Sequence, residues 1–275
     1  MLLCIDIGNT NIVLGTYEGE SLVHHWRIAT GRERMADEYG ALLLMLLEQA
    51  GHRPSEIQDA VMASVVPPLT GQFVELCRRY LGVEPLVVDA GVRTGVRVRV
   101  DNPREVGADR IVNAAAAFRR YGGPACVVDF GTATTFDAIS EEGDYLGGAI
   151  APGIAVAAAA LTERTARLPR VELVAPPQAI GRNTVHSMQS GLIFGYVGLV
   201  EGMVARFRKE LGPRMRVIAT GGLAELLARE TDVFHAVDPW LTLEGLRLIH
   251  GMNRPAKGQD ARTPGPPESP IAGVR

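Results

Sequence analysis

The first segment of the chain with residues suited to phosphate chemistry is the turn from Asp6 to Asn11, in which Gly8 is followed by three polar side chains. Glycine lets the backbone approach a ligand closely, and the backbone N–H groups form a concave set of donors for phosphate oxygens. Asp6 would repel phosphates directly, so the pattern predicts a Mg²⁺ ion between its carboxylate and a polyphosphate. An ordinary β-hairpin turn, which favours the same residue types, is the alternative.

A second turn, Asp129 to Thr135, repeats this pattern in the other half of the chain. Asp129, Gly131 and several hydroxyl side chains offer a second cation site and further phosphate donors. Each turn is expected between two strands, and an acidic turn and a third strand follow in both halves. The repetition indicates an internal duplication whose two turns face each other across a cleft, which favours a nucleotide site over two unrelated hairpins.

Two further segments supply chemistry of their own. The glycine turn Thr220-Gly221-Gly222 follows a predicted strand and precedes a predicted helix, so an adenosine can lie against its backbone, although a glycine pair is also common in plain loops. Asp109 and Arg110 stand at the start of a predicted helix, where the macrodipole favours an ionised carboxylate. Asp109 is therefore a candidate proton acceptor for a hydroxyl group, with a helix-capping aspartate beside a surface arginine as the alternative.

The elements that must position these residues alternate between strand and helix patterns, which predicts an α/β architecture. Strands are expected over residues 2–5, 12–16, 23–28, 60–66, 85–89, 126–129, 216–219 and 233–237. Helices are expected over residues 37–50, 69–81, 105–121, 183–211, 223–228 and 243–250. We expect an N-terminal domain over residues 1–115, a C-terminal domain over residues 116–253 and a disordered tail over residues 254–275, where proline and glycine accumulate.

Composition narrows the class of protein. The 275 residues carry a formal net charge of −3, which gives no long-range attraction to nucleic acid or to an anionic membrane. The most apolar stretches fall short of the ~20 residues that a spanning helix needs, so no membrane partner is expected. The three cysteines are far apart and show no metal or disulfide pattern, which is typical of a cytoplasmic protein.

Four glycines share one face of the long helix predicted from residue 183: Gly191, Gly195, Gly198 and Gly202. Each destabilises a helix by roughly 0.8–1.0 kcal/mol relative to alanine, so a close neighbour is expected to compensate. The spacing leaves open whether that neighbour is the chain's own sheet or the same helix of a second subunit.

Together with the stretches Asn102–Arg110 and Gly181–Gly191, the two turns resemble the type III pantothenate kinase family over residues 1–252. The Asp-x-Gly turns alone mark only the broader superfamily of acetate kinase, sugar kinases, Hsp70 and actin. The Gly-Ala-Asp-Arg stretch and the Asn-Thr-x-x-Ser-Met-Gln-Ser-Gly stretch narrow it to this family. The resemblance implies an α/β actin-like ATPase fold, with two duplicated ribonuclease H-like domains and a central cleft.

The resemblance also implies roles for individual residues. The ATP phosphates are held by a loop of Asp6, Ile7, Gly8, Asn9, Thr10, Asn11, Ile12 and Val13, with Thr132 as a further ATP contact. Pantothenate is contacted by Gly107, Ala108, Asp109, Arg110 and Thr184, with Asp109 as the proton acceptor. Asp6 lies near Mg²⁺, and Asp129 forms a site for a monovalent cation, K⁺ or NH₄⁺. Val100 stands at a substrate-side position where many family members carry an aromatic residue, often tyrosine.

The implied function is ATP-dependent phosphorylation of pantothenate to 4′-phosphopantothenate, the first step of coenzyme A biosynthesis, by a cytoplasmic homodimer whose substrate pocket lies near the subunit interface. Three other functions share the same turns. The first is a kinase of another small hydroxy or carboxylate substrate, and the second is a non-enzymatic ATP-binding transcriptional accessory protein. The third is an ATPase of the Hsp70 or actin type, for which 275 residues are few. The missing basic surface and the presence of Asp109 argue against the accessory protein.

Overall fold

The structure, a computed structural model, describes residues 1–254; the predicted tail lies outside the described residues apart from Arg254. Its first sheet has five strands in the order β3-β2-β1-β4-β5. These strands are β1 (Leu2–Ile7), β2 (Asn11–Glu18), β3 (Ser21–Ala29), β4 (Asp59–Ser64) and β5 (Leu86–Val87). Strands β1, β2 and β3 form an antiparallel meander, and β4 joins β1 in parallel.

The second sheet repeats this arrangement. Its order is β10-β9-β6-β7-β8. The strands are β6 (Ala125–Phe130), β7 (Ala133–Ile139), β8 (Tyr145–Pro152), β9 (Arg216–Gly221) and β10 (Ala236–Val237). Here β6, β7 and β8 form the antiparallel meander, and β9 joins β6 in parallel. The predicted duplication and the predicted fold class of two ribonuclease H-like units are both confirmed.

The two phosphate turns connect equivalent strands but differ in length. Asp6 pairs with Val13 across the first hairpin, whereas Asp129 pairs with Thr135 across the second, so the first turn is one residue longer. In both hairpins the glycine N–H donates back across the turn, from Gly8 to the Asn11 carbonyl and from Gly131 to the Ala133 carbonyl, at 3.0 Å each. Both turns therefore present the residues after the glycine at the end of the sheet.

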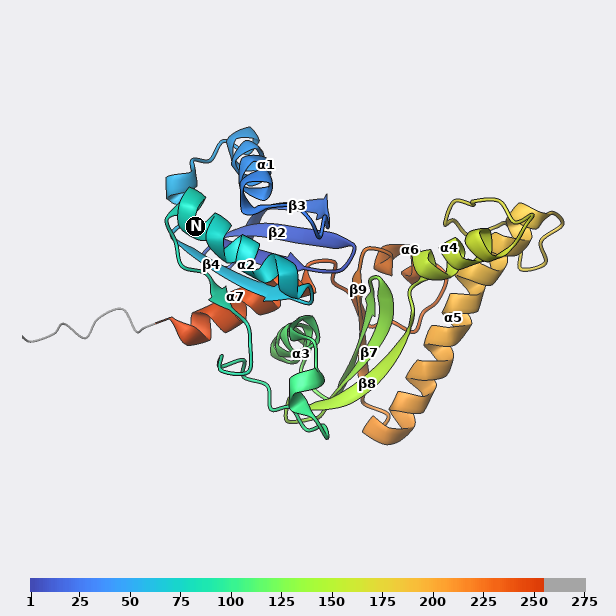
Figure 1. Ribbon diagram of the computed structural model, residues 1–275. Coiled ribbons are helices and arrows are strands. Elements are labelled where there is room, and N and C mark those ends of the chain that lie inside the picture. The colour runs from blue at the N-terminus through green and yellow to red at the C-terminus, as the bar shows by residue number, and fades with distance from the viewer. Residues whose placement is uncertain (255–275) are drawn as a thin grey trace, which may run out of the picture.

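Helices cover the outer face of each sheet and fill the space between the sheets (Figure 1). The helices are α1 (Ala36–Gln49), α2 (Pro67–Leu76) with a π-helical end over Cys77–Leu81, α3 (Ala108–Tyr121), α4 (Ile154–Arg164), α5 (Thr184–Leu211), α6 (Ala224–Ala228) and α7 (Leu241–Asn253). Helices α1 and α2 pack on the first sheet, and α5 packs on the second. Helices α3 and α7 lie between the two sheets and pack against each other.

The alanine run of α3 explains how one helix serves both halves. Val112 and Ala115 join the cluster of the first sheet, while Ala114, Ala116 and Ala117 join the cluster of the second sheet. Methyl side chains on both sides let the two sheets approach the helix closely. Because α3 begins at Ala108, this packing fixes Asp109 at the centre of the molecule.

Most predicted elements are present, with three differences. The predicted strands over 85–89 and 233–237 shrink to the two-residue strands β5 and β10, and the predicted helix over 105–121 begins at Ala108 after a separate single turn, Pro103–Glu105. Helix α4 was not predicted at all. Its apolar sequence continues directly from β8, and only Pro152 and Gly153 separate the two elements.

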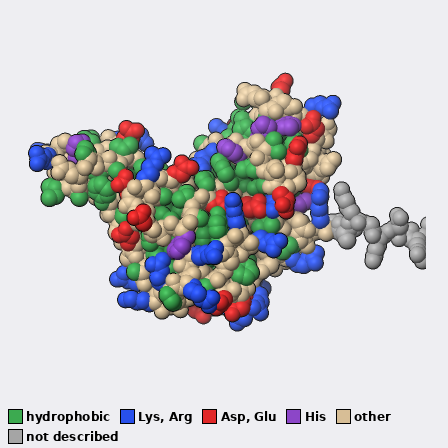
Figure 2. All heavy atoms as spheres, turned by 180° about the vertical axis from the view of Figure 1, so that it is seen from behind, with side chains coloured by type: hydrophobic (Ala, Val, Ile, Leu, Met, Phe, Trp, Pro, Cys, Tyr) green, Lys and Arg blue, Asp and Glu red, His purple; other side chains and the backbone are tan. Residues whose placement is uncertain are grey.

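Helix α4, residues 165–183 and the first turns of α5 form an arm that projects from the second sheet (Figure 1). Five large hydrophobic side chains are exposed on this arm: Val156, Leu161, Val174, Ile180 and Val185. Figure 2 shows hydrophobic side chains gathered on it.

Within residues 1–254, α5 alone is long and apolar enough to cross a membrane by length and composition, and 44% of its most apolar window is buried. A core helix of a soluble protein passes the same test, so this is weak evidence for a span.

Candidate active site

A cleft between the two halves of the molecule is lined by both phosphate turns, and it is a cavity of about 420 Å³. Residues of β1, β2 and β3 line one side, and residues of β6, β7 and β9 line the other. Asp109 at the start of α3 and Thr242 at the start of α7 close the cleft from the helices between the sheets. The volume suits a nucleotide or another ligand of similar size.

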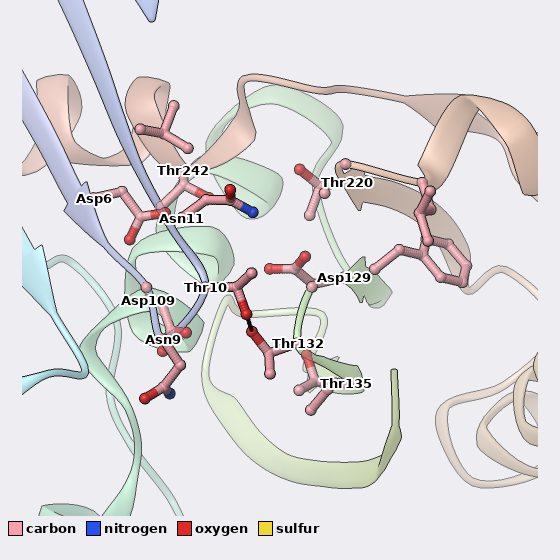
Figure 3. Close-up of a pocket in the computed structure, with 18 of the residues that line it drawn as sticks. Asp6, Asn9, Thr10, Asn11, Asp109, Asp129, Thr132, Thr135, Thr220 and Thr242 are labelled. Atoms are coloured by element: carbon pink, nitrogen blue, oxygen red, sulfur yellow. Dashed lines mark hydrogen bonds between the residues drawn. The ribbon is translucent and has the colours of Figure 1, made fainter. Parts of the chain in front are cut away.

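The two turns touch each other at their tips. The hydroxyl groups of Thr10 and Thr132 share a hydrogen bond of 2.6 Å, which Figure 3 shows at the centre of the cleft. The first turn is also held by the chain that follows β3: the Thr30 hydroxyl donates to the Gly8 carbonyl at 2.7 Å, and Arg32 donates to the Asn9 side chain at 2.9 Å. The Asp-x-Gly turns are thus fixed relative to each other before any ligand binds.

Three carboxylates face this cleft, from Asp6, Asp109 and Asp129 (Figure 3). Burial and then the neighbouring charges of Asp109 and Asp129 raise the pKa of Asp6 well above its usual range. Burial, with Asp109 and Asp137 as further causes, raises the pKa of Asp129 to about 7. Burial also raises the pKa of Asp109, whereas the backbone N–H and the guanidinium of Arg110 lower it by a smaller amount. A cation between these carboxylates would relieve their mutual repulsion.

Asp129 is oriented by residues from three elements. The Asn113 amide of α3 donates to its carboxylate at 3.2 Å, and the Thr242 hydroxyl of α7 donates to the Asn113 carbonyl oxygen at 2.8 Å. Gly221 ends β9 at a φ of 91°, and a Cβ there would lie 2.5 Å from the Asp129 carboxylate. Only glycine satisfies both constraints, so the third glycine turn makes room for Asp129.

Asp109 lies in the first turn of α3, where its carboxylate accepts a hydrogen bond of 2.9 Å from the Arg110 backbone N–H. A Cβ on Gly107, two residues earlier, would lie 2.5 Å from the same carboxylate, so glycine at this position leaves room for it. The sequence predicted that the helix end keeps Asp109 ionised. Burial raises the pKa of Asp109 in opposition to that effect, which makes the carboxylate a stronger base.

Arg110 is turned away from the cleft. Its Nε donates to the buried Asp137 at 2.6 Å, and its guanidinium lies 5.7 Å from the centre of the Tyr145 ring, whose hydroxyl donates to the same carboxylate at 3.0 Å. The alternative of a surface arginine is therefore wrong, because the Arg110 side chain is only 15% exposed. Its buried Nη2 has no hydrogen-bond partner within residues 1–254.

The structure brings together most of the predicted site residues. The cleft is lined by Asp6, Gly8, Asn9, Thr10, Asn11, Val13, Asp109, Asp129 and Thr132. Ile7 and Ile12 are fully buried in the core, so only their backbone can face a ligand. Gly107 and Ala108 directly precede Asp109. Arg110, Val100 and Thr184 do not line the cleft: Val100 packs beside Gly147, and Thr184 begins α5 at the exposed arm.

Three lining residues were not predicted from the sequence: Arg27, Trp240 and Thr242. Asn113, which contacts Asp129, was also missed. Arg27 and Trp240 carried no spacing signal. Thr220 lines the cleft as part of the glycine turn that the sequence did single out.

The donor set suits Mg²⁺ shared with a polyphosphate. No group of three or more His, Cys, Asp or Glu side chains able to hold a metal ion occurs within residues 1–254. Asp6 and Asp129 instead offer hard oxygen ligands beside hydroxyl and amide groups. Mg²⁺ usually keeps several waters and binds through one or two carboxylates plus substrate phosphates. The cleft therefore fits an ion that arrives with its nucleotide.

Comparison with known proteins identifies the family. The sequence profile of the type III pantothenate kinase family matches residues 2–206. A type III pantothenate kinase of Roseiflexus sp. (strain RS-1) is 59% identical over 254 residues, which cover 92% of this chain and 100% of the relative. Those of Moorella thermoacetica and Myxococcus xanthus are 57% and 54% identical over 253 residues, with 92% of this chain and 100% and 99% of the relatives covered.

Solved structures share the fold at low sequence identity. A structure from Campylobacter jejuni assigned to the Baf family of transcriptional activators has a TM-score of 0.57 and 23% identity, over 91% of this chain and 98% of the other. A structure from Sinorhizobium meliloti assigned as a 2-dehydro-3-deoxygalactonokinase has a TM-score of 0.60 and 12% identity, over 96% and 100%. The family profile and the curated relatives agree on one conclusion: this chain belongs to the type III pantothenate kinase family.

Proposed function

We propose that the chain transfers the γ-phosphoryl group of ATP to pantothenate and releases ADP and 4′-phosphopantothenate, the first step of coenzyme A biosynthesis. The observation that carries this proposal is the convergence of Asp109 with both Asp-x-Gly turns in one cleft. A kinase must hold a polyphosphate and a proton acceptor for the attacking hydroxyl at the same place. Membership of the kinase family supplies the identity of the acceptor.

The nucleotide is assigned to the two turns. The residues Asp6 to Val13 and Thr132 hold the phosphates through backbone N–H and side-chain donors. The adenosine lies toward the Gly221–Gly222 turn, which also lines the cleft. Mg²⁺, bound near Asp6, supplies positive charge to the phosphates. Without that charge, the carboxylates of Asp6 and Asp129 would repel the polyphosphate.

The transfer itself requires little covalent chemistry from the protein. The primary hydroxyl oxygen of pantothenate bonds to the γ-phosphorus while the bond from that phosphorus to the β–γ bridging oxygen breaks and its electron pair leaves with ADP. The hydroxyl proton passes to the Asp109 carboxylate. Burial raises the pKa of Asp109, which strengthens it as a base. Alignment of the reactants supplies most of the remaining rate enhancement.

The acceptor is assigned to the Asp109 side of the cleft. Gly107, Ala108, Asp109 and Arg110 contact pantothenate, with Val100 and Thr184 as further substrate positions. Arg110 requires a change of partner for this role, because Asp137 now holds its Nε. A monovalent cation, K⁺ or NH₄⁺, is assigned to Asp129, where the Thr220 residue supplies further oxygen atoms beside the carboxylate.

The active unit is proposed to be a cytoplasmic homodimer. A Cβ on Gly191, Gly195 or Gly198 would have no heavy atom within 4 Å, so the chain's own sheet does not pack on this face of α5. Apolar side chains are also exposed on the arm, at Val174, Ile180 and Val185. A second copy covering this surface would also account for Thr184, which lies on the arm and outside its own cleft. The division into domains at residue 115 remains part of the proposal.

A panel of acceptors separates this proposal from its rivals. The chain is incubated with γ-labelled ATP and either pantothenate, acetate or a hexose, and the labelled product is identified by mass spectrometry. Label on pantothenate alone supports the proposal. Label on acetate or a hexose would indicate a kinase of another acceptor. Nucleotide binding with no transfer to any acceptor would favour a non-enzymatic ATP-binding protein.

A further inference from the structure

One basic side chain, Arg27, lines the cleft, and it is the only lysine or arginine among the lining residues within residues 1–254. Three carboxylates line the same cavity. A triphosphate with about four negative charges enters a site with excess negative charge, so each fixed positive charge there has a large effect on binding. The loop from Asp6 to Val13, to which the phosphates are assigned, contains no lysine or arginine of its own.

The position of Arg27 follows from the pleat of β3. Alternate residues of this strand, Trp26 and Ile28, pack against the core under α1 and α2. Arg27 therefore points to the opposite face of the sheet, the face that borders the cleft, where Val13 is its cross-strand neighbour. The guanidinium then reaches across to the other half of the molecule: a Cβ on Gly222 would lie 2.6 Å from its Nη1.

The guanidinium has no strong partner of its own in the cleft. Arg27 takes part in no ion pair within residues 1–254, whereas Arg110 is held by the Asp137 carboxylate and Arg32 by the Asn9 amide. Its charge still acts on both phosphate-turn aspartates, because it lowers the pKa values of Asp6 and Asp129 against the larger effect of burial. Arg27 is thus a charged donor near both Asp6 and Asp129 and beside the glycine turn assigned to adenosine.

We propose that Arg27 is a catalytic residue that binds the β-phosphate of ATP and stabilises the negative charge that develops on ADP as the γ-phosphoryl group leaves. The inference rests on the proposed function, which puts a nucleotide in this cleft. A position beside Gly222 is on the adenosine side of the two turns, and Asp109 marks the acceptor side. The β-phosphate lies between these ends, whereas the γ-phosphoryl group must lie next to Asp109.

The chemistry of the transfer suits this role. In a loose transition state the bond to the bridging oxygen is largely broken, and charge accumulates on the leaving ADP. A preorganised guanidinium presents a planar fork that matches two phosphate oxygens, and it keeps its charge at every working pH. Such a contact strengthens as the charge grows, so it lowers the barrier as well as improving binding.

A structural role is the competing interpretation. Arg27 would then act only as a strut between β3 and the Gly222 turn, and its loss would loosen the whole cleft. The two roles differ in one measurable respect. A strut affects every nucleotide alike, whereas a β-phosphate ligand affects ADP and ATP but leaves AMP unchanged.

The test uses the full chain with Arg27→Gln, Arg27→Lys and, as a matched control, Arg53→Gln. Arg53 belongs to the same half of the molecule, is 83% exposed and pairs only with Glu56. Dissociation constants are measured for Mg²⁺-ADP and for AMP, together with the melting temperature and kcat. Arg27→Gln should weaken ADP binding at least about tenfold, the effect of one charged hydrogen bond, and change AMP binding less than about threefold.

Arg27→Gln should also lower kcat at least about tenfold, and Arg27→Lys should recover part of both losses, because it keeps the charge without the fork. The control should match the parent. Equal weakening of ADP and AMP would overturn the inference, as would unchanged ADP binding in Arg27→Gln. A parent that binds ADP but does not phosphorylate pantothenate would sink the proposed function alone, because the comparison of ADP with AMP still decides the role of Arg27.

Discussion

Thr10 and Thr132, each one or two residues after the glycine of its own turn, are joined by a hydrogen bond of 2.6 Å between their hydroxyl groups. This bond ties one half of the duplication to the other across the cleft. Both side chains lie in the cleft (Figure 3). If the nucleotide binds as proposed, the bond exchanges for two hydrogen bonds to phosphate, which preserves the hydrogen bonding of both groups.

Replacement of Thr132 by valine tests this exchange. The change keeps the shape of the side chain and removes the hydroxyl, so one phosphate donor is lost while the fold is retained. One neutral hydrogen bond contributes about 0.5–1.5 kcal/mol, so KM for ATP should rise roughly two- to tenfold. Steady-state kinetics at saturating pantothenate measure it, with Thr231→Val at the surface as the control. An unchanged KM would mean that Thr132 does not contact the nucleotide.

Asp109→Asn tests the assignment of the proton acceptor. The amide is nearly isosteric with the carboxylate and can still accept the hydrogen bond from the Arg110 N–H, so the fold and ADP binding should persist. Turnover should fall by roughly 10²–10⁴, the usual contribution of a general base. The measurement is kcat with pantothenate beside the dissociation constant for ADP. Turnover within about threefold of the parent would show that another group takes the proton.

The site at Asp129 predicts a dependence on the monovalent cation. Replacing K⁺ with Na⁺ at constant ionic strength should lower the rate sharply, because a carboxylate that shares the cleft with Asp6 and a polyphosphate needs charge beyond that of Mg²⁺. Asp129→Asn should be slow in both salts and should lose the difference between them. Equal rates of the parent chain in the two salts would contradict the assignment of a monovalent cation to Asp129.

The ligand-free chain should lose stability as the pH rises. An unfolded aspartate titrates near its ordinary pKa of about 3.9, whereas burial raises the pKa of Asp129 in the fold to about 7. Between these values the folded chain keeps a proton that the unfolded chain has lost, so the contribution of this group is full below the unfolded pKa and disappears above about pH 7. The groups that face Asp129 include Asp109 and Asp137, which raise its pKa, and Asn113 and Arg27, which lower it.

Melting temperatures from pH 5 to pH 8 measure this effect, with Asp129→Asn as the comparison. The parent should melt lower at pH 8, and the variant should show a flatter profile, because the amide does not titrate. Asp6 adds to the parent's slope, since its pKa is also raised. A parent profile as flat as that of the variant would show that Asp129 is ionised throughout.

Gly195→Leu tests the proposed dimer. A Cβ at Gly195 meets no heavy atom within 4 Å, so the larger side chain should not unfold the subunit. If α5 packs on its copy, the leucine should clash there and give a folded monomer with little kinase activity. Light scattering measures the oligomeric state, and kcat measures the activity. Gly82→Ala is not a suitable control, because Gly82 has a φ of 69° that alanine rarely adopts. An active dimer would place the interface elsewhere.

The sequence predicted the elements that follow a clear period and missed the contacts made between distant elements. The two hairpins, the long helix α5 and the turns at Asp6 and Asp129 follow from local patterns of apolar residues and glycine. The role of Arg27 could not be predicted, because the sequence pattern of a strand does not show whether an arginine faces solvent or a cleft. Asn113 and Thr242 are 129 positions apart, and only the packing of α3 against α7 joins them beside Asp129.

Burial bears on two expectations about charge. On spacing alone, a surface arginine beside a helix-capping aspartate was the alternative for Arg110, yet Asp137 and Tyr145 enclose it. Burial raises the pKa of Asp109, an effect opposite to that expected from the helix end. The environment of Arg110 is not local, since it depends on how β7 and β8 approach α3.

ADP release with and without pantothenate tests the central claim most directly. The purified chain is assayed with Mg²⁺-ATP and K⁺ by coupling ADP formation to NADH oxidation, first without an acceptor and then with pantothenate. The account predicts negligible release alone, a large increase with pantothenate, and one 4′-phosphopantothenate formed for each ADP. ADP release that pantothenate does not change, in a chain that binds ATP, would contradict it.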